Sequence, residues 1–118
     1  MRAKDAVGRY GEQVAATFLT DAGMTILDRN WTCQWGEIDI VAQVGDTLVI
    51  CEVKTRTGLG YGSPIEAVTP RKLSRLRVLA MAWVRAHDVH PAQLRIDVVG
   101  IVPATDGPDQ IEHLQAVG

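Results

Sequence analysis

Two apolar segments joined by a glycine-containing turn constrain the fold of this chain most strongly. They form the stretch "GEIDIVAQVGDTLVICEVK", residues 36–54, in which Ile, Val and Leu dominate on either side of a Gly-Asp pair. Such a pattern predicts two antiparallel β-strands joined by a tight turn. Four charged residues stand inside these otherwise apolar strands: Glu37, Asp39, Glu52 and Lys54. Charged side chains are seldom buried unless they are paired or bound. The pattern therefore indicates either a solvated sheet face or a functional site.

Alternation of side chains along a strand predicts which charges share a face. In the first strand, one face carries Glu37, Asp39 and Val41, and the other carries Ile38 and Ile40. In the second strand, one face carries Leu48, Ile50, Glu52 and Lys54, and the other carries Val49, Cys51 and Val53. The acidic residues of the two strands are thus expected on one side of the hairpin.

Two registers of the hairpin are compatible with its turn. A two-residue loop that begins at Gly45 places Asp39 opposite Glu52 and Glu37 opposite Lys54, whereas a loop that begins one residue earlier makes Asp39 and Glu52 diagonal neighbours. Directly opposed side chains start about 5 Å apart. Two like charges at that distance repel by roughly 3 kcal/mol at an effective dielectric constant near 20. Either register therefore predicts a compensating cation: Lys54 in part, and more fully Mg²⁺ or Mn²⁺, which prefer oxygen ligands.

A helix is expected before the hairpin, from about Asp5 to Ala22, with Gly23 as its C-terminal stop. Its apolar arc comprises Val7, Val14, Ala15, Phe18, Leu19 and Ala22. Glu12 falls beside this arc. Its position alone leaves two interpretations open: a solvated helix side chain, or a carboxylate that points along the helix–sheet interface towards the edge of the sheet.

A second helix is expected after the hairpin, from about Pro70 to His87, with Thr69 as N-cap and Pro70 at the first helical position. Its core stripe comprises Leu73, Leu76, Ala80, Trp83 and Val84. Arg71 and Arg75 lie on the opposite face, and Lys72 borders the stripe. These cations are either solvated helix surface or, with Arg56, contacts to nucleic-acid phosphates, which position a strand without reading its sequence.

The remaining elements complete an order of helix, three strands, helix and strand, with a short final strand. Residues 94–102, "LRIDVVGIV", predict a strand in which Asp97 is either a structural hydrogen-bond acceptor or a supporting partner of the site. The segment "IEHLQAVG" predicts an edge strand, and the glycine-rich residues 57–64 predict a loop. Trp31 and Trp35, at the entrance of the hairpin, are candidates to stack on a base or a partner.

Composition limits the class of protein. The chain has 118 residues, 47% of them hydrophobic and 22% charged, which suits one globular domain spanning residues 1–118. It has neither an apolar run long enough to cross a membrane nor the apolar region of a signal peptide, so a cytoplasmic location is expected. The histidines show no metal-ligand spacing. A net charge of −2 argues against a general binder of polyanions, although cations cluster between Lys54 and Arg77.

Together these motifs resemble the PD-(D/E)xK nuclease superfamily. The motifs "GxxGExxAxxFLxxxGxxIxxRNW", "GEID", "EVKTR" and "RIDVVGI" occur in this order over nearly the whole chain. In this combination they more closely resemble the bacterial YraN-like family, whose members are similar to archaeal Holliday-junction resolvases. One departure is Ile38, which stands where the superfamily pattern has a proline before the motif aspartate.

The resemblance implies a restriction-endonuclease-like αβββαβ core, an α/β fold with a central mixed sheet flanked by helices. It identifies Asp39 as the motif aspartate, Glu52 as the motif acid and Lys54 as the motif lysine. Glu12 matches the first-helix glutamate that completes the metal site in resolvase-like members, so the resemblance implies metal ligands at Glu12, Asp39 and Glu52.

The activity that this resemblance implies is hydrolysis of DNA phosphodiester bonds, with Mg²⁺ or Mn²⁺ as cofactor and branched or structured DNA among the substrates. The phosphate contacts would come from Arg56, Arg71, Lys72 and Arg75, and a homodimer would match resolvase-like relatives. The alternative hypothesis is a nucleic-acid-binding or protein-interaction module that keeps the nuclease fold without turnover. The presence of Glu12, Asp39, Glu52 and Lys54 together favours the nuclease, whereas the mildly acidic overall charge favours the module or indicates a required partner.

Overall fold

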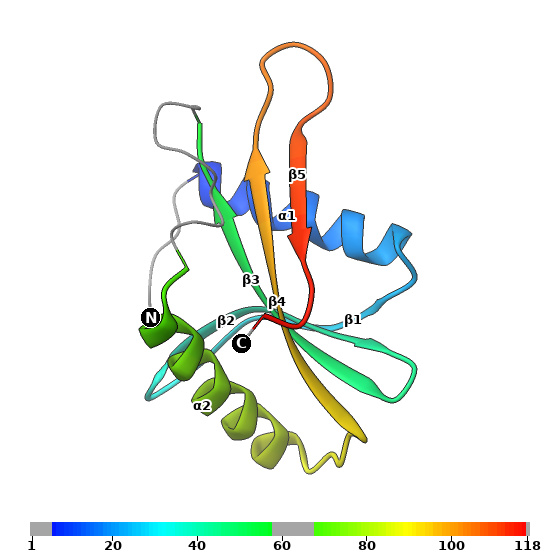
Figure 1. The fold of residues 1–118 in the computed structure, drawn as a ribbon, viewed down its shortest axis with the longest axis vertical. Coiled ribbons are helices and arrows are strands. Elements are labelled where there is room, and N and C mark those ends of the chain that lie inside the picture. Colours follow the sequence, from blue (N-terminus) through cyan, green and yellow to red (C-terminus); the bar gives the residue numbers. More distant parts are fainter. Residues whose placement is uncertain (1–5, 58–67, 118) are drawn as a thin grey trace.

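The computed structural model describes residues 6–57 and 68–117, which form a mixed α/β fold (Figure 1). Its elements are α1 (Ala6–Asp21), β1 (Thr25–Cys33), β2 (Gly36–Val44), β3 (Thr47–Thr55), α2 (Pro70–His87), β4 (Gln93–Val102) and β5 (Gln110–Leu114). The strands build one sheet in the order β1-β2-β3-β4-β5, antiparallel except for the parallel pair β3–β4. The expected mixed sheet with helices is confirmed. The predicted helix start at Asp5 and residues 58–64 of the predicted loop lie outside the described residues.

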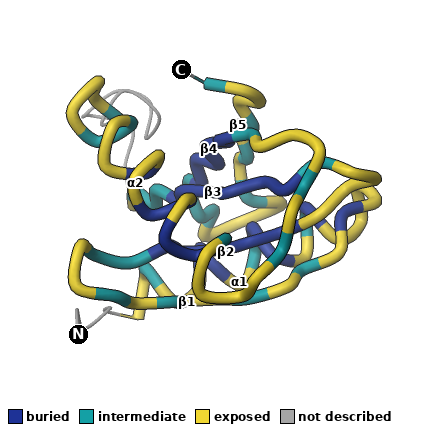
Figure 2. Tube along the Cα trace, turned by 90° about the horizontal axis from the view of Figure 1, so that it is seen from below, coloured by how far each residue is buried: buried dark blue, intermediate teal, exposed yellow. Residues whose placement is uncertain are grey.

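The two helices cover opposite faces of the sheet, and each face has its own apolar core. On the α1 side, Ala15 and Leu19 pack with Ile40, Cys51 and other buried strand residues. On the α2 side, the buried residues include Ile38, Val41, Ile50, Leu76, Leu79 and Trp83. Figure 2 shows the buried residues running through the central strands β2, β3 and β4, between the two helices. The central strands are therefore apolar on both faces, and charges inside them need a specific reason.

The predicted bounds of α2 are confirmed. Thr69 is extended, with φ −105° and ψ 164°, and its hydroxyl accepts a hydrogen bond from the Lys72 backbone N–H at 3.2 Å. Pro70 has no N–H and fits the first turn, where that donor would have no partner in the helix. The predicted core residue Trp83 is 4% exposed. These caps place Lys72 and Arg75 in the first two turns, beside the sheet.

The buried face of α1 is rotated relative to the predicted arc. Gly11, Glu12, Ala15, Ala16 and Leu19 are buried, whereas Val7 and Ala22 are exposed, contrary to prediction. The helix ends as expected at Gly23, whose φ of +98° favours glycine, and the Met24 N–H donates to the Leu19 carbonyl at 3.0 Å. Glu12 therefore lies inside the contact face at 3% exposure, which excludes the solvated interpretation.

Gly11 brings α1 close to β3. A Cβ atom at this position would lie 1.8 Å from Thr55 Oγ1 and 2.9 Å from Thr55 Cβ. We expect Gly11→Ala to lower the free energy of unfolding by about 1–3 kcal/mol, despite the better helix propensity of alanine. Urea denaturation measures this loss. The double variant Gly11→Ala/Thr55→Ala should recover part of it, and a double variant no more stable than Gly11→Ala would contradict the assigned contact.

The β1–β2 hairpin reverses its faces part of the way along. Ile40 packs on the α1 side, but Ile38 packs on the α2 side with Val41. The prediction that Ile38 and Ile40 share a face is therefore wrong. The paired positions run from Arg29↔Ile40 to Trp31↔Ile38 and pass over Asn30, which has a left-handed φ of 52°. Asn30 and the facing Asp39 are thus the point where regular alternation fails.

Candidate functional site

Asp39 is held at the end of the β2–β3 ladder. The pairing of Val44 with Thr47 confirms the register that begins at Gly45, and the ladder runs from there to Ile40↔Cys51. One step further, where the register places Asp39 opposite Glu52, the Asp39 Oδ2 atom accepts a hydrogen bond from the Val53 N–H at 2.9 Å. The carboxylate thus takes the place of a strand carbonyl as acceptor. Asp39 is 1% exposed, so both its position and its environment are fixed.

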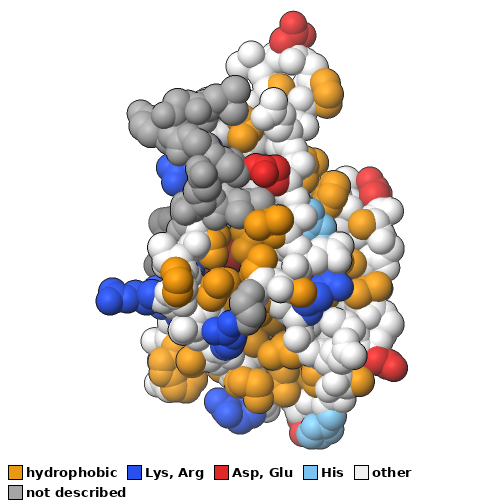
Figure 3. All heavy atoms as spheres, viewed as in Figure 1, with side chains coloured by type: hydrophobic (Ala, Val, Ile, Leu, Met, Phe, Trp, Pro, Cys, Tyr) orange, Lys and Arg blue, Asp and Glu red, His pale blue; other side chains and the backbone are white. Residues whose placement is uncertain are grey.

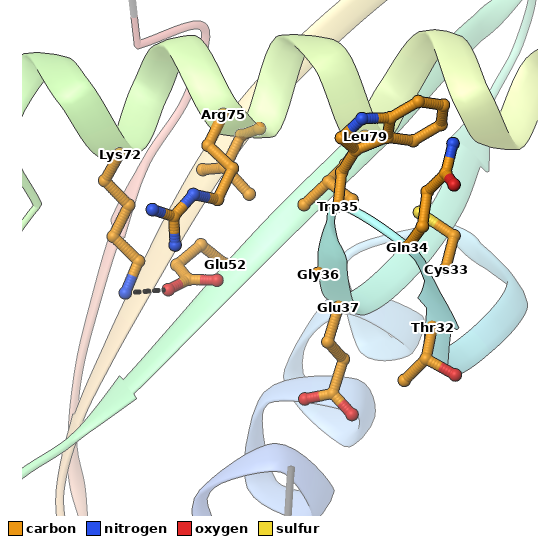
Figure 4. Close-up of a pocket in the computed structure, with 11 residues that line it drawn as sticks. Thr32, Cys33, Gln34, Trp35, Gly36, Glu37, Glu52, Lys72, Arg75 and Leu79 are labelled. Atoms are coloured by element: carbon orange, nitrogen blue, oxygen red, sulfur yellow. Dashed lines mark ion pairs between the residues drawn. The ribbon is translucent and has the colours of Figure 1, made fainter. Parts of the chain in front are cut away.

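Glu52 is the centre of a compact charge cluster. Its Oε2 atom lies 2.6 Å from Lys72 Nζ of α2 and 3.4 Å from Lys54 Nζ of its own strand, while the residue is 3% exposed. Figure 4 shows Lys72 and Arg75 extending from α2 towards Glu52. Burial raises the pKa of Glu52, and the nearby charge of Asp39 raises it further, so the two effects outweigh the stabilisation that the lysines provide. The carboxylates are therefore close enough to interact.

The pKa values of Lys54 and Lys72 shift in opposite directions. Burial lowers the pKa of Lys54, and the neighbouring Lys72 lowers it further, against the influence of Glu52. Although burial lowers the pKa of Lys72 as well, the hydrogen bond to Glu52 and the charge of the nearby acids raise it overall. The positive charge of Lys72 therefore opposes a second positive charge on the neighbouring Lys54.

Glu12 reaches the site region from the α1 side. Its Oε1 atom accepts a hydrogen bond from the Asn30 side-chain amide at 2.7 Å. Among residues 6–57 and 68–117, no group of three His, Cys, Asp or Glu side chains lies in an arrangement that could hold a metal ion. The structure therefore brings Asp39, Glu52 and Lys54 together but does not gather Glu12 with the two acids into one ligand set.

Glu37 belongs to another part of the hairpin. It is paired across β1–β2 with Thr32, and Figure 4 shows its side chain pointing away from α2. The expected opposition of Glu37 and Lys54 is not a rung of the β2–β3 ladder, because that ladder ends at Ile40↔Cys51. Val41, predicted to share a face with Glu37, packs instead with the α2 core. Glu37 and Val41 therefore lie on opposite faces of the sheet, because the alternation of β2 reverses at Asp39.

The other predicted cations take different positions around this cluster. Arg71 and Arg75 are exposed, and Arg56 is partly buried, with its backbone N–H donating to the Ile101 carbonyl at 3.0 Å. Figure 3 shows Lys and Arg side chains standing out from the surface over α2. Lys72, predicted as a phosphate contact, is paired with Glu52 in this structure. Sequence periodicity indicated that Lys72 borders the buried face, but it did not identify the partner.

A cavity of about 470 Å³ lies between the β1–β2 turn and α2 and was not predicted from the sequence. Its lining comes from both elements and from β3, and includes Trp35, Gly36, Glu52, Lys72, Arg75 and Leu79. Gly36 has a φ of +138°, and a Cβ atom there would lie 3.7 Å from Leu79 and 3.9 Å from Arg75. The turn therefore approaches the helix closely at its glycine, and the indole of Trp35 lies beside α2 near Leu79 (Figure 4).

Asp97 forms a separate buried cluster at the β4–β5 side. It is 0% exposed and accepts hydrogen bonds from Arg95 Nε at 2.9 Å, from Arg95 Nη2 at 3.0 Å and from the Ala116 N–H at 3.0 Å. The His113 Nε2 atom lies 2.7 Å from its second oxygen. This arrangement supports the structural interpretation of Asp97. It also gives His113 a defined contact that its spacing in the sequence did not suggest.

Comparisons with a family profile and with individual proteins identify the same family. The sequence profile of the "Uncharacterised protein family UPF0102" matches residues 11–101, which include Glu12, Asp39, Glu52 and Lys54. The chain is 55% identical to a UPF0102 protein of Kineococcus radiotolerans over 118 residues, covering 99% of this chain and 97% of that protein. It is 52% identical to a UPF0102 protein of Beutenbergia cavernae over the full length of both. In the described part of the chain, neither helix has the length and apolar character needed to cross a membrane.

Proposed function

Because the chain belongs to the Uncharacterised protein family UPF0102, whose description assigns no activity, we propose its function from the site itself. We propose that it is a Mg²⁺- or Mn²⁺-dependent endonuclease that hydrolyses DNA phosphodiester bonds, with branched or structured DNA among its substrates. The observation that carries this proposal is the pair of buried carboxylates, Asp39 and Glu52, on neighbouring strands with Lys54 beside them. The resemblance of these residues to the PD-(D/E)xK motif supports the same assignment.

The donor chemistry of the acid pair fits a divalent cation. Asp39 and Glu52 are nearly fully buried, and the charge of Asp39 raises the pKa of Glu52, so the pair favours an added positive charge. Carboxylate oxygens are the ligands that Mg²⁺ and Mn²⁺ prefer. Asp39 and Glu52 would hold the ion. Once bound, the ion would supply activation of a water molecule and neutralisation of charge on the phosphoryl oxygens.

Lys54 and Lys72 suit two further requirements of hydrolysis, which are the orientation of the water molecule and the stabilisation of charge on the phosphate. Burial and the neighbouring Lys72 lower the pKa of Lys54, so it releases a proton more readily than an ordinary lysine does, and its Nζ atom lies 3.4 Å from Glu52 Oε2. A phosphate group of bound DNA would compete with Glu52 for the Lys72 ammonium, which would free the Oε2 atom of Glu52 as a ligand. Lys54 is then placed to orient the water, and Lys72 to stabilise charge on the phosphate.

A second candidate is a nucleic-acid-binding module without turnover, retaining this fold. It is favoured by the short Lys72–Glu52 contact of 2.6 Å, because an ammonium already neutralises the carboxylate. The lack of a three-ligand acidic group among residues 6–57 and 68–117 favours it as well. In this alternative the charge cluster around Glu52 stabilises the contact between α2 and the sheet, and the cations around α2 bind the nucleic acid.

Removal of the metal separates the two candidates. We expect the purified protein to cut DNA in Mg²⁺ or Mn²⁺ and to leave it intact in EDTA, because the hydrolysis requires the cation at Asp39 and Glu52. Labelled single-stranded, linear duplex and four-way-junction DNA are incubated in each condition, and products are separated on denaturing gels. Metal-independent binding with no product from any substrate would support the module and overturn the nuclease proposal.

A further inference from the structure

We infer that the cavity between the β1–β2 turn and α2 receives an unstacked nucleobase of the DNA, next to the phosphate that lies at Glu52. Trp35 is the stacking surface, and Arg75 and Lys72 hold the phosphates on either side. This inference rests on the proposed function and defines its substrate class: DNA with unpaired nucleotides, such as a single strand, a loop or the open centre of a branch.

The cavity reaches Glu52, one member of the acid pair. Glu52 and Lys72 line the cavity together with Trp35, so a strand that contacts the charge cluster also borders the aromatic ring. Trp35 lies near Leu79, and Lys72 lies in the first turn of α2. The separation of Lys72 and Leu79 amounts to about 10 Å along the helix axis. A distance of this order suits a base and the phosphates flanking it. The volume of about 470 Å³ falls within the range of small-ligand sites.

The side chains of this cavity match the chemistry of a nucleotide rather than that of an apolar ligand. Trp35 is 48% exposed, so much of its ring contributes nothing to the core and is open to stacking. The cations Lys72 and Arg75 extend from α2 into the same space. Glu37 also lines the cavity, but its side chain points away from the helix (Figure 4). An aromatic plane beside two cations is the combination that single-stranded nucleic acid binds through its bases and phosphates.

A paired base cannot make this contact. In a duplex the faces of the base are covered by its neighbours, so an enzyme must act on unpaired nucleotides or move the base out of the stack. The cavity lies between the turn that carries Trp35 and α2, so a base must leave the stack to reach the face of the indole there. Unpaired DNA is therefore expected to bind more tightly than duplex DNA of equal length.

Binding is tested in EDTA, so that metal-dependent cleavage does not enter the measurement. Fluorescence anisotropy compares a labelled oligothymidylate with a strand of the same length made of abasic nucleotides, which keeps the phosphates and lacks the bases. We expect the wild type to bind the thymidylate strand roughly tenfold more tightly than the abasic strand. Trp35→Ala should lose about that tenfold on thymidylate and change nothing on the abasic strand, while Trp35→Phe should retain most of the preference.

Two controls make the result specific. Met81→Ala removes an apolar side chain of α2 that is 45% exposed and does not line the cavity, and this variant should bind like the wild type. Thermal melting verifies that each variant is folded, and Trp35→Phe tests the ring if Trp35→Ala is not. Equal loss on both strands, no loss on either, or no binding by the wild type would overturn the inference.

The outcome is independent of the nuclease proposal. If Trp35 governs affinity for thymidylate but no metal yields cleavage, the base site stands and the proposed activity fails. If the protein cleaves DNA and Trp35→Ala binds thymidylate with wild-type affinity, the activity stands and the base site fails.

Discussion

Asp39→Asn is expected to lower the rate of DNA cleavage by at least about a hundredfold. The substitution removes the charge with which Asp39 would hold the divalent ion, and a metal contributes several kcal/mol of transition-state stabilisation in hydrolysis. The fold should survive, because the asparagine carbonyl can still accept the hydrogen bond from the Val53 N–H, which is 2.9 Å from Asp39 Oδ2. The change therefore separates the chemistry of this side chain from its structural contact.

Three measurements check this expectation. Initial cleavage rates give the effect on activity, calorimetric titration with Mn²⁺ gives the effect on metal binding, and thermal melting shows whether the fold is retained. Asp46→Asn, at the exposed opposite end of the β2–β3 hairpin, is the matched control and should behave like the wild type. Cleavage by Asp39→Asn at the wild-type rate would remove Asp39 from the proposed site.

Asp97→Asn is expected to cost the protein about 3 kcal/mol of unfolding free energy. Removing one partner of a buried ion pair usually costs about 3–5 kcal/mol, because the other partner remains buried without its counter-charge. We expect the lower end of this range because the Arg95 side chain is 23% exposed and can reach solvent. The His113 side chain is only 10% exposed and would stay buried without its partner. The asparagine carbonyl can still accept the hydrogen bond from the Ala116 N–H, so the loss comes from the contacts with Arg95 and His113.

Calorimetry or urea denaturation measures this loss, which corresponds to a fall in melting temperature of about 10 °C. Asp106→Asn, an exposed acid in the β4–β5 connection, is the control and should leave the melting temperature unchanged. Below its melting temperature, Asp97→Asn should cleave DNA at the wild-type rate if the role of Asp97 is structural. Loss of cleavage without loss of stability would instead connect Asp97 to the site.

Local sequence signals predicted the elements that depend on local interactions. Thr69 and Pro70 marked the start of α2, because a cap and the first turn are determined by neighbouring residues. The alternation of β3 also held, because β3 is regular and buried between two helices: Val49 and Cys51 pack towards α1, and Ile50 packs towards α2. The sequence left two registers open for its turn, and the pairing of Val44 with Thr47 selects the one whose loop begins at Gly45, which has a φ of +58°.

The sequence could not predict the features that depend on distant contacts or irregular backbone. Counting residues assumes that a strand alternates throughout, so it missed the reversal at Asn30 and Asp39. The pair of Lys72 with Glu52 depends on how α2 lies across the sheet, which periodicity does not determine. The rotation of α1 that buries Glu12 likewise depends on packing, including the close contact of Gly11 with Thr55.

The irregular backbone of β1 also affects how the molecule meets its own copies. β1 is an outer strand, and an outer strand with a continuous row of free N–H and C=O groups invites pairing with another chain and aggregation. The register shift between Ile26 and Asp28 and the left-handed Asn30 interrupt that row twice within Thr25–Cys33. A second molecule therefore meets only short stretches of regular strand there. The residue that supports Glu12 and faces Asp39 thus also helps to keep the sheet from growing at that edge.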